Sequence, residues 1–180
     1  HTYTFSILFF FMAKAKTGLF YIRATIDVDT SETPQQEDLS VYVDPVNRQG
    51  LLIRQVDFIW HDKATFLPMQ PSADWEAVIQ IHDTTLGALV AFENPHQVAS
   101  ASLVSVNASA TEANQDFFPD RLGMGKGEGR IVVNDSLEIV TDGSASVPAN
   151  LAVTMILECQ VVTLSQKDYI SLALQSVADN

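Results

Sequence analysis

The chain has 180 residues, of which 47% are hydrophobic and 18% charged, and its 22 acidic and 10 basic residues give a formal net charge of −12. This length suits one well-buried core, and the composition excludes a disordered chain, which has too few apolar residues to offset chain entropy. The negative charge repels polyanions and excludes a protein that coats nucleic acid with its whole surface.

The single cysteine, Cys159, excludes an internal disulfide and a metal site made of cysteines alone. It lies in the apolar run "LAVTMILECQVV", which predicts a buried and inert thiol.

The first residues combine an apolar run, Phe5–Met12, with lysines that follow it. The run is shorter than the about 20 residues that span a bilayer, and a secretory signal would carry its positive charge before the run. Either Met12 is the natural start, or the segment is an extended apolar arm that must be buried, with a neighbouring copy as the candidate surface. We predict an N-terminal arm over residues 1–18 and a single β-sandwich domain over residues 19–180, with no transmembrane segment.

Alternation of apolar and polar residues predicts strands in the first third of the chain. The first strand is "GLFYIRATIDVD", followed by a polar loop, "TSETPQQED". A short strand, "LSVYV", and a turn, "DPVNRQG", come next. In the following strand, "LLIRQVDFIW", one side is predicted to carry Leu52, Val56, Phe58 and Trp60.

The middle of the chain begins with a long loop, "HDKATFLPMQPSAD". The strand "WEAVIQIHD" is predicted to point Trp75, Ala77, Ile79 and Ile81 inward and Glu76, Gln80 and His82 outward. Two further strands, "ALVAF" and "VASASLVSV", flank the turn "ENPH". Residues 107–129 are predicted to be irregular, and connections of that length usually carry an interaction or form a lid.

The last third contains "RIVV" and "LEIV", whose connection "NDS" predicts a hairpin. Residues Leu151–Leu164 are predicted to form a long strand that is apolar on both faces apart from Thr154, Glu158 and Gln160. This is typical of a strand in the middle of a sheet or beneath another layer. The segment "DYISLALQSV" is predicted to be the last strand, with a short helix as the alternative. Eight to ten short strands without a long amphipathic helix predict an all-β sandwich, jelly roll or barrel.

The stretch "RLGMGKGEGR", residues 121–130, has glycine at every second position. A Walker-type phosphate loop needs Ser or Thr directly after its Gly-Lys pair, whereas Lys126 is followed by Gly127. A dinucleotide-binding turn opens a helix, whereas a strand pattern follows here. We interpret the stretch as an adjustable loop that approaches a neighbouring backbone closely and orders on assembly, together with Phe117 and Phe118.

Catalytic and metal-binding patterns are weak. His61, His82 and His96 could supply a zinc site, but His-Asp pairs at residues 61–62 and 82–83 are more typical of solvated caps at strand ends. No Gly-X-Ser-X-Gly elbow occurs, and a carboxylate pair of the glycosidase kind cannot be located by sequence. Asp57 is predicted to pair with Arg54 or Arg48. We therefore predict no catalytic residue, cofactor or metal.

The order of these features resembles a single jelly-roll capsid protein of a small icosahedral virus. The resemblance is carried by "GLFYIRATIDVD" as a first strand, "VDPVNRQGLLIRQVDFIW" as a turn and strand, and "LAVTMILECQVVTL" as a late core strand, and it rests on architecture across nearly the whole chain. It implies an antiparallel two-sheet sandwich of jelly-roll type with about 8–10 strands. It also implies a large homo-oligomer in the virion, joined by its loops and its arm, with other capsid proteins as further partners.

In one common version of such proteins the arm is strongly basic and binds the genome. This chain offers only Lys14 and Lys16 for an arm that contacts nucleic acid, which argues against direct contact with the genome. The predicted assembly contacts are the large apolar residues of the arm and of the glycine-rich loop: Phe5, Ile7, Leu8, Phe9, Phe10, Phe11, Phe117, Phe118 and Met124.

Two other function classes stay open on the sequence alone. A ligand-binding or carbohydrate-binding β-sandwich, such as an attachment domain, predicts an exposed row of aromatic residues. Its candidates are Trp60, Trp75, Tyr42 and Phe66, although both tryptophans lie in apolar register. An enzyme of cupin or glycosidase type predicts clustered histidines or paired carboxylates inside the barrel.

Overall fold

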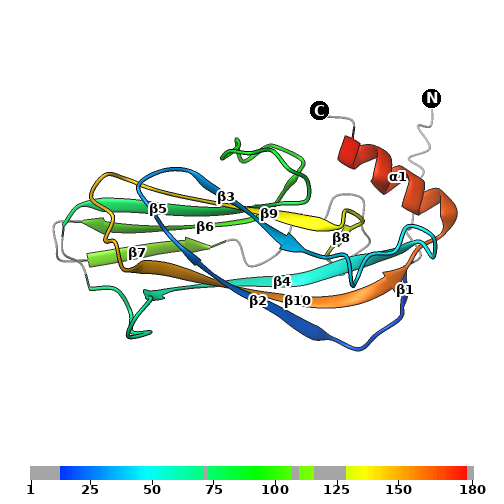
Figure 1. Cartoon of the computed structure of the whole chain (residues 1–180), viewed down its shortest axis with the longest axis horizontal. Helices are drawn as coiled ribbons and strands as arrows, with labels where there is room; N and C mark the ends of the chain where they lie inside the picture. Colours follow the sequence, from blue (N-terminus) through cyan, green and yellow to red (C-terminus); the bar gives the residue numbers. More distant parts are fainter. Residues whose placement is uncertain (1–12, 71–72, 107–109, 116–128, 178–180) are drawn as a thin grey trace, which may run out of the picture.

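The chain folds into two antiparallel β-sheets packed face to face, in a computed structural model that describes residues 13–70, 73–106, 110–115 and 129–177 (Figure 1). The strands within these residues are β1 (Lys14–Ala15), β2 (Phe20–Asp27), β3 (Thr33–Asp38), β4 (Gln49–Asp62), β5 (Trp75–His82), β6 (Gln97–Val106), β7 (Ala110–Gln115), β8 (Arg130–Val132), β9 (Ser136–Gly143) and β10 (Leu151–Thr163). A helix, α1 (Gln166–Val177), follows the last strand.

The strand order is that of a jelly roll. One sheet, called sheet A, has the order β2-β10-β4-β8, and the other, sheet B, has the order β3-β9-β5-β6. Four antiparallel pairs connect early strands with late ones: β2 with β10, β3 with β9, β4 with β8, and β5 with β6. This is one long hairpin folded over into two sheets. The predicted all-β sandwich of jelly-roll type is therefore confirmed.

The two remaining strands extend the sheets at their edges. β1 pairs with β10 beyond the end of β2, and β7 pairs with β6 at the edge of sheet B. β7 lies within residues 107–129, which were predicted to be irregular.

Sequence patterns failed where an edge strand is polar or a turn is apolar. The predicted loop "TSETPQQED" contains β3, whose mostly exposed polar side chains and Pro34 suit its position at the edge of sheet B. The predicted strands "LSVYV" and "ALVAF" are turns and irregular chain. Leu39 and Val43 are nevertheless buried, because the turn at residues 39–43 places both against the core.

The predicted hairpin between "RIVV" and "LEIV" is wrong. β8 pairs with β4 in sheet A, whereas β9 pairs with β3 and β5 in sheet B. The short connection at residues 133–135 therefore crosses from one sheet to the other, as consecutive strands of a jelly roll do.

A β-bulge in β4 changes which side chains face the core. The register with β10 shifts between Glu158 and Cys159, so that Arg54 is the extra residue of β4. Val56 and Phe58 face the core as predicted, but beyond the bulge the inward positions are Leu51 and Ile53. Leu52, which was predicted to share a side with Val56, instead belongs to a second apolar cluster.

The last segment is the helix α1 and not a strand. Ser165 Oγ accepts a hydrogen bond from the backbone N–H of Asp168 at 3.2 Å and donates one to its carboxylate at 2.7 Å, which caps the first turn. One side of the helix packs against the second apolar cluster through Tyr169, Leu172 and Ala173. That cluster consists of Leu52, Ile131, Val133, Val162 and Leu164, and α1 lies beside β8 at one end of the sandwich (Figure 1).

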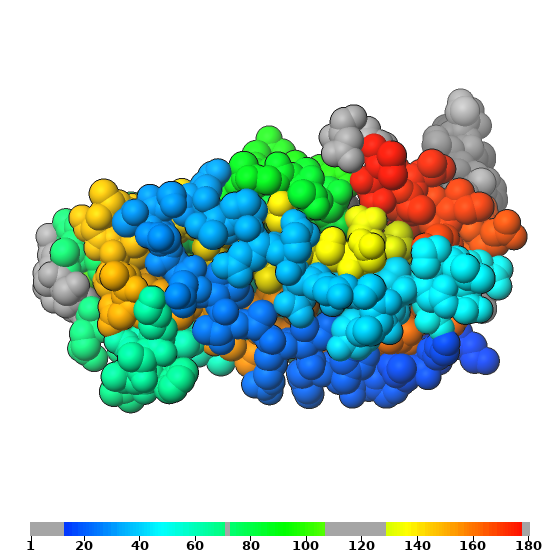
Figure 2. Space-filling model, viewed as in Figure 1, coloured from blue at the N-terminus to red at the C-terminus, as the bar shows by residue number. Residues whose placement is uncertain are grey.

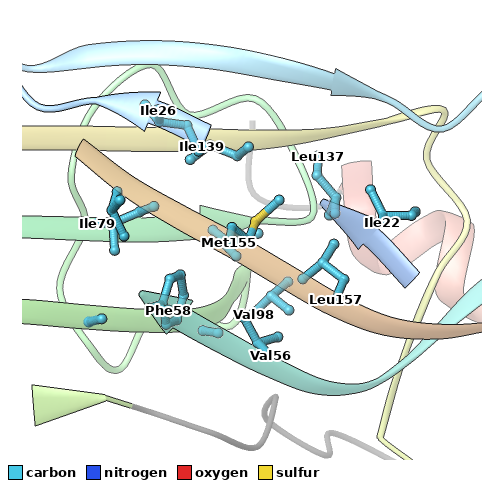
Figure 3. Close-up of a cluster of buried hydrophobic side chains, with 14 of the residues drawn as sticks. Ile22, Ile26, Val56, Phe58, Ile79, Val98, Leu137, Ile139, Met155 and Leu157 are labelled. Carbon is cyan, nitrogen blue, oxygen red and sulfur yellow. The ribbon is translucent and has the colours of Figure 1, made fainter. Parts of the chain in front are cut away.

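The main core lies between the two sheets (Figure 3). Sheet A contributes Ile22, Ile26, Val56, Phe58, Met155 and Leu157, and sheet B contributes Ile79, Val98, Leu137 and Ile139. β10 is thus buried in the core on its inner face, while the end of its outer face lies in the cluster beneath α1. β10 lies in the middle of sheet A, which was one of the two positions predicted for this strand.

Gly129, the last glycine of the glycine-rich stretch, leads into β8 with a φ of +97°. A Cβ at this position would overlap the carbonyl oxygen of Ile53. The backbone at Gly129 therefore lies close to β4 of the same chain, whereas residues 121–128 of the predicted adjustable loop lie outside the described residues.

We predict that Gly129→Ala lowers the free energy of unfolding by at least about 2 kcal/mol, because it combines left-handed strain with steric overlap. Urea denaturation measures the difference. Gly18→Ala is the control, since no atom lies within 4 Å of the added Cβ, and it should change stability by less than about 0.5 kcal/mol. Equal effects of the two substitutions would contradict this account.

Candidate functional site

The residues predicted to make assembly contacts lie outside the described residues. These are Phe5, Ile7, Leu8, Phe9, Phe10, Phe11, Phe117, Phe118 and Met124. Lys14 and Lys16 are described and exposed at the edge of sheet A. Lys14 belongs to β1 and lies opposite Thr163 of β10. Lys16 donates a hydrogen bond to the side chain of Gln49.

A buried polar cluster lies on the outer face of sheet B. Gln80 and His82 point away from the core as predicted, but both are buried. The prediction that His82 belongs to a solvated cap is wrong because the loop of residues 83–96 folds back over this face. Gln80 donates to the carbonyl oxygen of Val90 and accepts from its N–H, both at 2.9 Å. Glu138 accepts hydrogen bonds from the N–H groups of Leu86 at 2.8 Å and Gly87 at 2.9 Å. His82 is 0% exposed between them.

Both ring nitrogens of His82 face oxygen atoms. Nδ1 lies 3.0 Å from a Glu138 oxygen, and Nε2 lies 3.1 Å from Oε1 of Gln80. The two hydrogen bonds to Val90 fix the orientation of the Gln80 amide. Gln80 Oε1 is therefore an acceptor, and His82 Nε2 donates to it. The side chains of His82 and Glu138 are both fully buried, so this contact is a buried histidine–carboxylate pair. The backbone donors and Gln80 offset the cost of burying it.

A second buried cluster joins the two sheets through Arg130 of β8. Its Nε lies 3.1 Å from Asp83 Oδ2, its Nη2 also binds that oxygen, and its Nη1 donates to the carbonyl oxygen of Gln97 at 3.2 Å. The other Asp83 oxygen lies 2.9 Å from Nδ1 of His96, and Asn134 donates to the Asp83 backbone carbonyl. Edge strand β8 of sheet A is thereby tied to both ends of the loop at residues 83–96.

The three histidines considered as zinc ligands do not come together. His61 lies on sheet A, with Nε2 2.7 Å from the Thr154 hydroxyl oxygen and Nδ1 3.0 Å from the Asp62 carbonyl oxygen. His82 and His96 each bind a different carboxylate of the two buried clusters. Among the described residues no group of three or more His, Cys, Asp or Glu side chains could hold a metal ion.

Asp57 differs from its predicted role. It accepts a hydrogen bond from Gln55 Nε2 at 3.0 Å, while Arg54, displaced by the bulge, lies 4.0 Å from Glu158. Sequence alone could not show this, because the bulge decides which way the Arg54 side chain points.

We predict that Glu138→Gln lowers the free energy of unfolding by about 3 kcal/mol, because it leaves buried His82 without its carboxylate partner. The loop at residues 83–96 should become sensitive to limited proteolysis, since the same carboxylate holds Leu86 and Gly87. Urea denaturation and mapping of the cleavage sites measure the two effects. Glu32→Gln, at an exposed turn, is the control and should behave as the unchanged protein; equal stability of both variants would refute the role given to Glu138.

The Cys159 side chain is buried in the main core, as predicted. Burial, and to a lesser extent the nearby charge of Glu158, raise the pKa of its thiol to about 12. The thiol is therefore protonated at neutral pH and is not available as a nucleophile.

We predict that native protein at pH 8 does not react with a thiol-specific disulfide reagent, and that one equivalent reacts after unfolding in guanidinium chloride. Absorbance of the released chromophore gives both values. Rapid reaction of the folded chain would show that Cys159 is accessible and ionised.

The four aromatic residues considered for carbohydrate binding do not form an exposed row. Trp75 is buried in the core, and Trp60 is half-buried against it. Tyr42 stacks on Phe20 with ring centroids 5.1 Å apart. Phe66 is exposed, and its ring is tilted over His61.

Exposed large apolar side chains do occur in loops at opposite ends of the sandwich. Phe66 and Leu67 follow the end of β4, and Val41 and Val46 precede its start. Because β4 has 14 residues and each strand residue rises about 3.3 Å, these two groups lie far apart. Figure 2 shows the two loops, in teal and cyan, at opposite ends of the molecule. Phe92 adds an exposed ring in the loop of residues 83–96.

No helix in the described part of the chain is long and apolar enough to cross a membrane.

Sequence comparison finds no matching protein-family model and no matching curated protein. Among solved structures, the chain is similar to a structure of Desmodium yellow mottle tymovirus, with 9% identity, 82% of each chain covered and a TM-score of 0.34. It is also similar to a Nora virus structure, with 12% identity and a TM-score of 0.37, over 92% of this chain and 64% of the other. The jelly-roll assignment itself rests on the strand order of this chain.

Proposed function

We propose that this chain is a structural protein, a self-assembling subunit of a viral capsid that resides in the virion. The observation that carries the proposal is the pair of exposed apolar loops at opposite ends of a jelly roll, Phe66 and Leu67 at one end and Val41 and Val46 at the other. Apolar side chains left exposed in groups mark surfaces for protein contact.

Two different surfaces at opposite ends favour head-to-tail contacts between copies. Such heterologous contacts repeat from one subunit to the next and close into rings or shells when the rotation between subunits allows it. A contact between identical patches would instead stop at a dimer.

The buried clusters support this role by fixing one of the loops before assembly. Glu138 holds Leu86 and Gly87, Gln80 holds Val90, and Arg130 and His96 hold Asp83. The loop that carries the exposed ring of Phe92 is therefore ordered in the free subunit, which reduces the entropy lost on binding.

The charge of the subunit fits controlled assembly. A net charge of −12 keeps free copies apart at low ionic strength, and salt screens that repulsion, so assembly should increase with salt. Phe117, Phe118 and Met124 remain proposed contacts of the glycine-rich loop. Lys16 already binds Gln49 and lies near Asp44, so the proposal includes no direct contact of Lys14 and Lys16 with the genome.

We predict that the purified chain forms uniform shells or rings and that Phe66→Asp shifts the population of assembled subunits at least about tenfold toward free ones at equal concentration. Phe66 has a positive φ of 62°, a conformation that aspartate tolerates, so the substitution removes the exposed ring without straining the loop. Sedimentation velocity and negative-stain microscopy measure the outcome.

The matched control is Ala64→Asp, which adds the same charge two positions earlier in the same exposed loop. It should leave assembly nearly unchanged. An unmodified chain that stays monomeric at every salt and protein concentration would overturn the proposed function.

A further inference from the structure

We propose that the uncharged apolar segment Phe5–Met12 covers an exposed apolar stripe on one side of α1 in the same chain. This inference goes beyond the proposed function and does not depend on it. It assigns an occupant to an apolar helix surface that the described residues leave open.

One exposed side of α1 carries an apolar stripe formed by Ile170, Leu174 and Val177. These residues are spaced by four and three positions, so they lie on one side of the helix, and they are 48%, 64% and 66% exposed. The adjacent side of the helix packs on the second cluster through Tyr169, Leu172 and Ala173. The apolar surface of α1 is therefore wider than the part that the second cluster covers, which is typical of a helix with a further neighbour.

The described chain begins beside this helix. β1 is antiparallel to β10, with Lys14 opposite Thr163 and Ala15 opposite Val162. Ala13 packs against the same second cluster as the inner side of α1. The segment that precedes Ala13 is therefore attached at the end of β10 where the chain passes through Ser165 into α1.

The segment has the length and the chemistry to cover the stripe. Twelve helical residues span about 18 Å, and eight extended residues reach about 26 Å, so Phe5–Met12 can run along α1 from its attachment point. Neither the segment nor the stripe contains a charged residue, so their contact would leave no buried charge unpaired.

The same chain is favoured over a second copy because the segment is already tethered at the site. A short tether gives a local concentration in the millimolar range, well above that of free subunits in a dilute solution. The sequence alone suggested that this segment is buried against a neighbouring copy. In the structure, Ala13 and β1 place its attachment point next to α1 of the same subunit.

Photo-crosslinking of the full chain tests the proposal. Benzoylphenylalanine replaces Leu174, and subunits labelled with ¹⁵N are mixed with unlabelled subunits before irradiation and mass spectrometry. We expect crosslinks from position 174 to residues 5–12 in which both peptides carry the same isotope label. The control places the probe at Phe66, at the far end of β4, where no crosslink to residues 5–12 is expected.

Crosslinked peptides of mixed label would show that a second copy supplies the segment and would overturn the proposal. The absence of any crosslink from position 174 to residues 5–12 would overturn it as well.

A second measurement is independent of the probe. Deletion of residues 1–12 should speed hydrogen exchange of the α1 amides at least about tenfold, while the amides of β9 in the interior of sheet B keep their rates. Unchanged exchange in α1 would contradict the proposal.

Discussion

The pairing of β10 along its whole length is the interaction on which the rest of the structure depends. β4 pairs with it from Leu151 to Thr163, and β2 and β1 occupy its other edge in succession. Its inner face contributes Met155, Leu157 and Cys159 to the main core, while Val162 joins the cluster beneath α1. This one strand therefore fixes sheet A, the core and the position of the helix, and the jelly roll follows once β3 and β9 pair in the opposite sheet.

Two polar clusters then determine which surfaces remain free. The His82–Glu138 pair and the Arg130–Asp83–His96 group hold the loop of residues 83–96 against sheet B. They hold His82 and His96, which the sequence offered as metal ligands, in buried hydrogen bonds. In such a subunit, the groups best placed to interact with a partner are the exposed apolar side chains at its ends.

The sequence predicted the fold class because alternation is strong in β2 and β5, where one face is buried, and because the long apolar run of β10 marks a strand in the middle of a sheet. It failed where long-range context decides: β3 is polar because it lies at an edge, and Leu52 faces outward because of a bulge. The burial of His82 depends on a loop folding back over the sheet, which no local pattern records. His82, Asp83 and His96 stand out in the sequence as candidate site residues. Their partners Glu138 and Arg130 could not be predicted, because they lie far along the chain.

The most direct test of the central claim is a cryo-electron microscopy map of the assembled particle. The account predicts a repeating contact in which the end of one subunit that carries Phe66 and Leu67 meets the end of the next that carries Val41 and Val46, with both apolar groups removed from solvent. A map of any assembly in which these loops stay exposed to solvent would contradict it.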